Sequence, residues 1–155
     1  MTQSTAEGAA FTELLLEVFR LNGLLLDAGD RLTRPLGLTS ARWQVLGVVE
    51  HGPVTVAQIG RVMGLARQSV QQLTDALERE GFVRYVDNPR HRRARLVQLT
   101  EKGEDAAARL IPAQAEWADR IGGVRTLAEW QAALATLRAL RARLEENASP
   151  TENNS

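Results

Sequence analysis

Apolar residues recur at helical spacing over two long segments near the ends of the chain. The first predicts a helix over residues 11–32, with more apolar positions than one narrow stripe needs. Such a helix is buried in its own core or against a partner, and we favour a subunit interface because 155 residues provide little core. Pro35 and Gly37 end this segment. The last helix, from Leu127 to Leu144, carries apolar residues three and four positions apart and has the same surplus.

Three shorter helices are expected between these segments, with ends marked by capping residues and glycines. The first begins after Thr39 or Ser40. The second covers residues 56–63 and begins after Thr55, and the third covers residues 66–80. A short helix, a turn and a longer helix in this order are typical of a helix-turn-helix.

The pattern then changes from helices to strands. Residues 82–86 and 96–100 are short runs rich in β-branched, aromatic and other apolar side chains. The turn-rich segment 87–95 joins them and contains four arginines, so the two runs predict a hairpin whose basic tip cannot belong to the core. A fifth helix opens at residues 100–103, and Pro112 should kink it.

These elements predict a mainly α fold with a small β-hairpin wing, namely a winged helix-turn-helix flanked by long N- and C-terminal dimerisation helices. The length fits one structural domain. Its parts along the chain are a flexible N-terminus (1–10), a dimerisation helix (11–37), a winged helix-turn-helix DNA-binding region (38–103), linker and dimerisation helices (104–146) and a disordered tail (147–155).

Composition removes several classes of protein. The absence of cysteine excludes disulfide scaffolds, thiolate metal sites and sensing by thiol oxidation. No apolar run approaches the roughly 18 residues of a membrane span. Residues 1–10 lack the basic and then apolar pattern of a signal peptide, so we expect a cytoplasmic protein that does not associate with a membrane.

Charge is distributed unevenly although the formal net charge is zero. Residues 55–100 contain eight arginines and four acidic residues, whereas the rest of the chain contains eleven basic and fifteen acidic residues. This asymmetry indicates one surface suited to a polyanion.

The predicted helix 66–80 has the side chains that a DNA-reading helix needs. Its outward N-terminal positions include arginine, which can bind guanine through two hydrogen bonds, and glutamine, which can do the same with adenine: Arg67, Gln68, Ser69, Gln71 and Gln72. The first acidic residue of this helix is Asp75, so nothing in its first two turns repels phosphate. The tip of the wing could enter an adjacent minor groove or lie along the backbone.

The same stretch resembles the MarR family of bacterial transcription regulators. The resemblance extends in outline from about Phe11 to Leu144 and is carried by five segments: TSARWQVL (39–46), TVAQIG (55–60), RQSVQ (67–71), LEREGFV (77–83) and RRARLVQLTEKG (92–103). It implies homodimers that bind a pseudo-palindromic operator in double-stranded DNA. It also implies repression until a small anionic or phenolic effector releases the protein.

Carried over by position, the resemblance assigns roles to single residues. Arg67, Gln68 and Gln71 would read bases, while Ser69 and Gln72 would contact phosphate or neighbouring bases. Arg92 and Arg93 would be the arginines at the tip of the wing 87–95. Thr55 and Arg90 complete the set expected to bind DNA.

The sequence departs from the family pattern in two places. His91 stands where an aspartate commonly fixes the wing by an ion pair, so either Asp87 takes its place or the wing is more mobile. Gln72 stands where an arginine is frequent, which removes one phosphate anchor. A protonated His91 would add positive charge near pH 6, but we favour an exposed histidine without a role.

The surplus of apolar residues on the two long helices predicts a homodimer through residues 11–32 and 127–144, although the helices could instead pack together within one chain. A dimer would set two recognition helices about one DNA turn apart, roughly 34 Å.

An effector pocket is expected where the dimerisation helices meet the DNA-binding region. Its candidate residues are Arg20, Asn22, Arg42, Trp43, His51 and Trp117. Arg42 is the best anchor for a carboxylate, whereas an aromatic residue such as Trp43 more often belongs to a core. The two histidines lie too far apart in the sequence to indicate a metal site, and no cofactor is expected.

Two other classes of function compete with this interpretation. An enzyme is disfavoured because the sequence has no nucleophile–base motif, metal cluster or phosphate-binding glycine loop. The alternative is a winged-helix module for protein interaction without sequence-specific DNA readout, which the basic recognition face disfavours. Binding to DNA through several arginines should weaken steeply with salt, whereas association of apolar helices should not.

Overall fold

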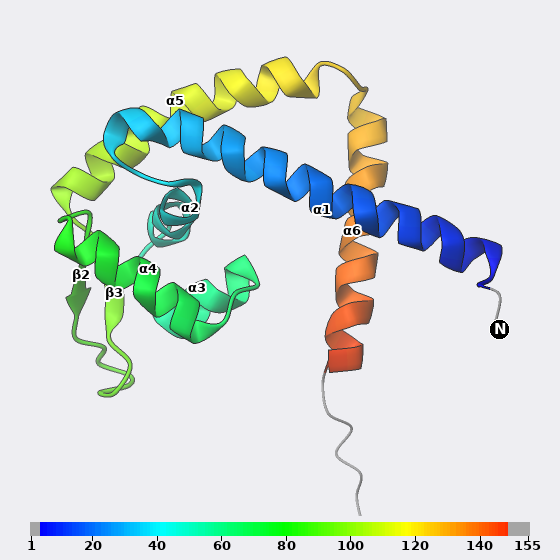
Figure 1. Ribbon diagram of the computed structural model, residues 1–155. Helices are drawn as coiled ribbons and strands as arrows, with labels where there is room; N and C mark the ends of the chain where they lie inside the picture. The colour runs from blue at the N-terminus through cyan, green and yellow to red at the C-terminus, as the bar shows by residue number, and fades with distance from the viewer. Residues whose placement is uncertain (1–3, 149–155) are drawn as a thin grey trace, which may run out of the picture. The chain divides into compact units, whose positions relative to one another are not determined.

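The computed structural model describes residues 4–148 and confirms the expected mainly α fold with a β-hairpin wing (Figure 1). Within this range the elements follow one another as α1 (Ala6–Thr33), the 3-10 turn η1 (Arg34–Leu36), α2 (Ser40–Val49), β1 (Val54–Thr55), α3 (Val56–Met63), α4 (Arg67–Arg79), β2 (Val83–Val86), β3 (Leu96–Leu99), α5 (Glu101–Gly122) and α6 (Leu127–Ala148). Pro112 lies inside α5, which continues through it.

The chain divides into two compact units, where the length alone suggested one domain. The first unit is Met1–Gln114 and contains α1 to α4, the sheet and the first part of α5. The second is Ala115–Ser155 and contains the rest of α5 and α6. All residues expected to bind DNA belong to the first unit.

The sheet has three antiparallel strands in the order β1-β3-β2. Val83 pairs with Leu99 and Tyr85 with Val97 between β2 and β3, as expected for a hairpin. Strand β1 pairs Val54 with Val97 and was not predicted, because two residues are too few to show an alternating pattern. Since β1 leads directly into α3, the short strand attaches the helix-turn-helix to the root of the hairpin.

The turn between α3 and α4 is compact. Thr55 caps α3 through a capping box with Gln58, and Gly64 ends α3 with a φ of +66°, which a glycine adopts without strain. A Cβ added at Gly60 would lie 2.9 Å from the carbonyl oxygen of Leu65, so only a glycine lets the turn pass this close.

One core holds the first unit together. It combines residues from α2, α3, α4, the hairpin and α5: Leu38, Val45, Leu46, Val49, Val56, Ile59, Val70, Leu77, Phe82, Val83, Val97, Leu99, Ala106 and Leu110. Helix α1 joins α2 at a close contact, where a Cβ added to Gly29 would collide with Ser40. Thr33 is fully buried beside this contact, and its hydroxyl donates to the carbonyl oxygens of Gly29 (2.9 Å) or Leu38 (3.0 Å).

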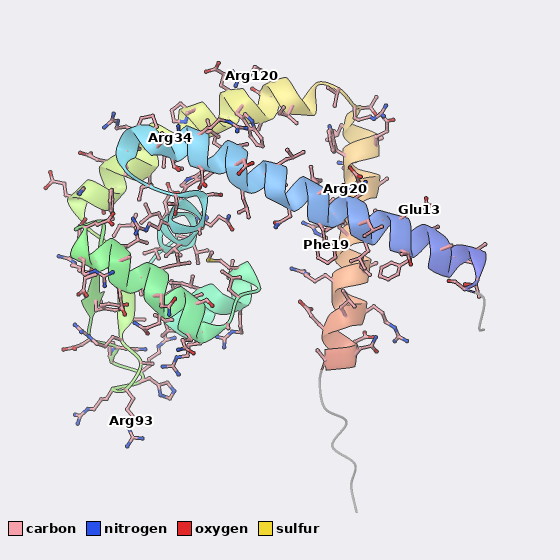
Figure 2. All side chains as sticks on the ribbon, viewed as in Figure 1. Glu13, Phe19, Arg20, Arg34, Arg93 and Arg120 are labelled. Carbon is pink, nitrogen blue, oxygen red and sulfur yellow. The ribbon has the colours of Figure 1, made fainter. Side chains whose placement is uncertain are left out.

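The long helices expose many apolar side chains. On α1 they are Phe11, Leu14, Leu16, Phe19, Leu21, Leu24, Leu25 and Leu26, and on α6 they are Leu127, Trp130, Leu134, Leu137 and Leu144. Phe19, labelled in Figure 2, is 65% exposed. Among the described residues no helix combines the length and apolar character needed to cross a membrane.

Both chain ends differ from the expected boundaries. Helix α1 starts at Ala6, five residues before Phe11, because the Thr5 hydroxyl accepts a hydrogen bond from the Gly8 amide (3.1 Å) and caps the helix there. Of the expected flexible N-terminus, residues 1–3 lie outside the described range. Helix α6 includes residues 147 and 148, which we expected in a disordered tail, and residues 149–155 also lie outside that range.

Candidate nucleic-acid interface

Helix α4 presents its N-terminal polar residues to solvent. Val70, Thr74 and Leu77 face the core, and four of the five α4 residues expected to bind DNA are exposed: Arg67, Gln68, Ser69 and Gln72. The residue before the helix is Ala66, which has no capping side chain, so the first backbone amides of α4 are not satisfied by a cap. Amides in this position attract phosphate oxygens.

The wing, residues 87–95, exposes its arginines. Arg90, Arg92 and Arg93 are all solvent-accessible, and Figure 2 shows Arg93 at the tip of the loop, pointing away from the helices of this unit. Asp87 and His91 are exposed as well. These residues together give the wing a surface of excess positive charge.

Asn88 fixes the shape of the wing. Its Oδ1 accepts a hydrogen bond from the Arg90 amide (3.1 Å), and its Nδ2 donates to the carbonyl oxygen of Ala94 (2.9 Å). Asp87 forms no ion pair within the described residues. Asp87, which the sequence suggested as the acidic partner in the wing, therefore does not close this loop. The neutral amide of Asn88 closes it instead.

The fourth arginine of the wing lies against the hairpin. Arg95 Nη2 donates to the carbonyl oxygen of Tyr85 (2.9 Å), and its guanidinium carbon lies 5.3 Å from the centre of the Tyr85 ring. Cation–π contacts of this kind add to the hydrogen bond. Arg95 thus supports the base of the wing, whereas the other three arginines extend from its tip.

Gln71 differs from its neighbours on α4 because its amide group is engaged inside the protein. Gln71 Nε2 lies 2.8 Å from Asp75 Oδ1 and 2.8 Å from the hydroxyl oxygen of Tyr85. The Tyr85 hydroxyl also lies 2.7 Å from Asp75 Oδ1 and 2.7 Å from Thr74 Oγ1. We call Gln71, Thr74, Asp75 and Tyr85 the Tyr85 cluster. It connects α4 to strand β2.

The ionisation of the cluster agrees with this geometry. The hydrogen bond from Tyr85, followed by that from Gln71, holds the pKa of Asp75 below its ordinary value. Burial, with a further contribution from the nearby Asp75 carboxylate, raises the pKa of Tyr85 to about 12. At neutral pH the cluster therefore contains a charged carboxylate that accepts from a neutral phenol.

Five of the residues expected to bind DNA line two hollows: Thr55, Arg67, Gln71, Arg90 and Arg93. One, of about 130 Å³, is lined by Thr55, Arg67, Gln71, Tyr85 and Arg93, among others. The other is a groove of about 580 Å³ between α3 and the wing, and its lining includes Thr55, Arg61, Asn88, Arg90 and His91. Arg61 was not among the predicted site residues, but it adds a further positive charge to this face.

Two of the six residues expected to bind an effector, Trp43 and Arg42, lie on α2. Trp43 lines a cavity of about 240 Å³ with Gln44, Gly47, Ile111 and Gln114 and also packs against the core. Arg42 Nη1 forms an ion pair with Glu80 Oε1 (2.7 Å).

Of the other four effector candidates, Arg20 and Asn22 lie on α1, His51 follows α2 and Trp117 lies on α5. Asn22 and His51 are exposed, and so is Arg20, which lies 3.7 Å from Glu17. Trp117 belongs to the second unit. Among residues 4–148 no cluster of three histidine, cysteine, aspartate or glutamate residues could hold a metal ion.

Four residues that hold α4 and the wing in place by hydrogen bonds were not predicted from the sequence: Asp75, Tyr85, Asn88 and Arg95. One signal was available, because Gln71 and Asp75 are four positions apart on a helix, a spacing at which glutamine and aspartate side chains hydrogen-bond. The contact with Tyr85 had no signal in the sequence, since it depends on how the hairpin packs against α4.

The DNA-binding region predicted from the sequence is similar to known proteins. The model of the MarR family matches residues 36–94. An uncharacterized protein of Mycobacterium tuberculosis is 41% identical over 90 residues, which are 58% of this chain and 63% of that protein. The transcriptional activatory protein BadR of Rhodopseudomonas palustris is 32% identical over 94 residues, covering 58% of this chain and 54% of BadR. The matched stretch therefore spans less than two thirds of either relative.

A solved structure extends the likeness in fold to most of the chain. The transcriptional regulator MosR of Mycobacterium tuberculosis, crystallised in complex with DNA, superimposes with a TM-score of 0.69 at 24% identity. The match covers 83% of this chain and 96% of MosR. With the helix-turn-helix, the three-stranded sheet and the wing in the same order, these findings show that residues 36–94 match the MarR family and that most of the chain shares its fold.

Proposed function

We propose that this protein is a transcription regulator that binds double-stranded DNA sequence-specifically as a homodimer. One observation carries the proposal: the exposed N-terminal face of α4 and the exposed tip of the wing belong to the same compact unit, and both carry arginine. A helix fits the major groove, where Arg67, Gln68 and Gln72 would meet base edges. Arg92 and Arg93 would contact the backbone or the adjacent minor groove, and Arg90 and Thr55 would contact phosphate.

The homodimer is proposed from the apolar side chains that α1 and α6 leave exposed. A second copy of the chain would cover both helices and remove this surface from water. A two-fold axis would also present two α4 helices to half-sites about one DNA turn apart, roughly 34 Å, which matches a pseudo-palindromic operator.

Control by a small anionic or phenolic effector, with repression in its absence, completes the proposal. The cavity beside Trp43 is the best candidate for a ligand, because it adjoins α2 and α5 in the first unit. Arg42 could anchor a carboxylate only by exchanging its ion pair with Glu80, so the ligand would have to compete with that carboxylate. The bacterial relatives named above suggest action in the cytoplasm, where the chromosome lies.

The experiment that tests this function is selection of bound sequences from a random duplex pool by the purified protein. We expect an inverted repeat with half-sites about 10 base pairs apart, and binding that weakens steeply between low and moderate salt. An Arg67→Ala, Gln68→Ala variant should lose the motif but keep binding to random duplex. If the wild-type protein recovers no motif at low salt, the protein is instead an interaction module that does not read DNA sequence.

A further inference from the structure

We propose that Gln71 is a positioning residue that does not read bases, and that the Tyr85 cluster fixes the recognition helix relative to the wing. This inference rests on the DNA-binding function proposed above. It assigns base reading on α4 to Arg67, Gln68 and Gln72. It also separates Gln71 from these residues, although all four lie within the first two turns of the helix.

The amide nitrogen of Gln71 already has hydrogen-bond partners within the protein. A neutral phenol has one proton to donate, and the charged Asp75 carboxylate is its strongest acceptor, at 2.7 Å. Gln71 Nε2 then donates toward Asp75 Oδ1 and the phenol oxygen, both at 2.8 Å. The amide nitrogen of Gln71 is therefore engaged inside the protein.

Adenine readout would require the amide group of Gln71 to bind the base. A glutamine reads adenine by donating through its amide nitrogen and accepting through its amide oxygen. A base would compete with Asp75 and Tyr85 for the amide nitrogen of Gln71. Leaving Asp75 would also remove a hydrogen bond from a charged and partly buried carboxylate, which is unfavourable. Arg67, Gln68 and Gln72 are exposed and have no such cost.

Tyr85 contacts helix α4 on one side and the base of the wing on the other. Its hydroxyl meets α4 through Gln71, Thr74 and Asp75, while its carbonyl oxygen and ring meet Arg95 at the base of the wing. Its strand is paired to β3, with Tyr85 opposite Val97. A rotation of the wing relative to α4 would therefore disrupt several polar contacts at once.

The consequence for DNA binding is geometric. The major-groove helix and the wing must meet the same duplex simultaneously, so their mutual orientation affects how well the operator fits. Gln71 contributes to recognition by maintaining that orientation. Its loss should weaken binding to the operator without changing which base is preferred at any position.

The test uses two variants and their combination in the full-length protein. Gln71→Met keeps the length of the side chain and removes its hydrogen bonds, and Tyr85→Phe removes only the hydroxyl. Gln98→Met is the matched control, because Gln98 on β3 makes one side-chain hydrogen bond with Arg84 in the same hairpin and does not touch the cluster. Thermal unfolding checks that each variant is folded, and Gln71→Met, at a partly exposed site, remains informative if Tyr85→Phe unfolds.

Each variant is then measured against the selected operator and against random duplex. We expect Gln71→Met and Tyr85→Phe each to weaken operator binding about fivefold, the factor given by the loss of one typical hydrogen bond. Binding to random duplex should stay unchanged. The double variant should lose little more than either single variant, because both remove the same contact. Sequences selected by Gln71→Met should show the wild-type motif.

Three outcomes would overturn the inference. A motif that loses its preference at one position of each half-site in Gln71→Met would make Gln71 a base reader. If the losses in affinity multiply in the double variant, the cluster does not position the helix. The same conclusion follows if Gln71→Met and Tyr85→Phe bind the operator as tightly as Gln98→Met does. Failure of the wild-type protein to select any motif would instead overturn the proposed function, and the inference with it.

Discussion

Asn88 closes the wing by donating from its Nδ2 to the carbonyl oxygen of Ala94, six residues further along the chain, at 2.9 Å. Its Oδ1 accepts from the Arg90 amide in the same loop. An amide needs no charged partner, so the shape of the wing does not depend on an ion pair that salt would screen. This explains how the wing can hold its shape although His91 occupies the place of the common aspartate.

Replacing Asn88 should loosen the wing without unfolding the protein. Asn88→Asp keeps an acceptor for the Arg90 amide and loses the donor to Ala94, and Asn88→Ala loses both. We expect faster hydrogen exchange of the wing amides in both variants, with the larger increase in Asn88→Ala. The affinity of both variants for DNA should fall several-fold whatever the DNA sequence, because each variant loses at least one hydrogen bond of about 1 kcal/mol. Asp87→Ala is the control, and equal exchange rates in Asp87→Ala and Asn88→Ala would contradict the role of Asn88.

Removing the charges at the wing tip should affect all DNA sequences alike. The Arg92→Ala, Arg93→Ala variant loses two exposed guanidinium groups that we expect at phosphates. Its plot of log binding constant against log salt concentration should be less steep by about 2, because each released phosphate contact contributes roughly 0.9. Arg109→Ala removes one guanidinium group from α5, away from the expected interface, and should leave the slope as it is. An unchanged slope in the double variant would remove the wing from the interface.

The phenol of Tyr85 should make stability depend on alkaline pH. Its pKa is raised from 10.0 to about 12, so the stabilisation is complete below pH 10 and is lost as pH rises from 10 to 12. The amount involved is of the order of 2 kcal/mol. Tyr85 is the only tyrosine in the sequence, so the ultraviolet absorbance of tyrosinate reports on this group alone.

We expect the absorbance titration to have its midpoint near 12, and Asp75→Asn to lower it, because the carboxylate is one of the groups that raise the pKa of Tyr85. The difference in unfolding free energy between wild type and Tyr85→Phe should shrink over the same pH range. A wild-type midpoint near 10 would mean that the phenol is not held in the cluster.

A charge on the exposed face of α1 should dissociate the proposed homodimer. Leu24 is 66% exposed, and a Leu24→Glu variant would bury a carboxylate if a partner covers this helix. Analytical ultracentrifugation should then show a monomer at concentrations where the wild type is a dimer. Val62→Glu introduces the same group at a position on α3 that is 67% exposed and should remain dimeric. A dimer that survives Leu24→Glu would place this residue outside the interface.

Gly103 is expected to be intolerant of a side chain. A Cβ at this position would collide with the carbonyl oxygen of Phe82 and approach Leu99 Cδ2 to 3.2 Å. Gly103→Ala should therefore destabilise the protein by about 1–3 kcal/mol, as overpacking does. Gly47→Ala is the control inside α2, where a Cβ meets nothing within 4 Å, and should stabilise by about 0.5–1 kcal/mol. Chemical denaturation measures both, and equal effects would contradict the close contact.

Elements with a strong local signal could be predicted from the sequence. Thr55 and Gly64 mark the two ends of α3, and the capping box and the positive φ supply the physical reasons. Strand β1 could not be predicted, because its pairing with β3 brings together residues more than forty positions apart. The start of α1 was also missed, since the apolar pattern begins at Phe11 and the helix is extended by the cap at Thr5.

The residue types of the candidate site could be predicted from the sequence, but the hydrogen bonds between them could not. The exposed polar residues of α4 and the basic wing follow from their spacing and charge. What the sequence could not provide is which of these side chains already have partners. Gln71 and Gln72 are adjacent and identical, yet one is engaged with Tyr85 and the other is exposed, a difference that arises only when the hairpin packs on α4.

The direct passage from β1 into α3 limits the ways in which this fold can be switched. Thr55 is both the last residue of the strand and the cap of the helix, so no flexible residue separates the sheet from the helix-turn-helix. The wing belongs to the same sheet, so strand pairing joins the start of α3 to the root of the wing without an intervening loop. A signal that moved α3 away from the wing would have to break this pairing or the cap of α3, whereas a displacement of the whole unit would leave both intact.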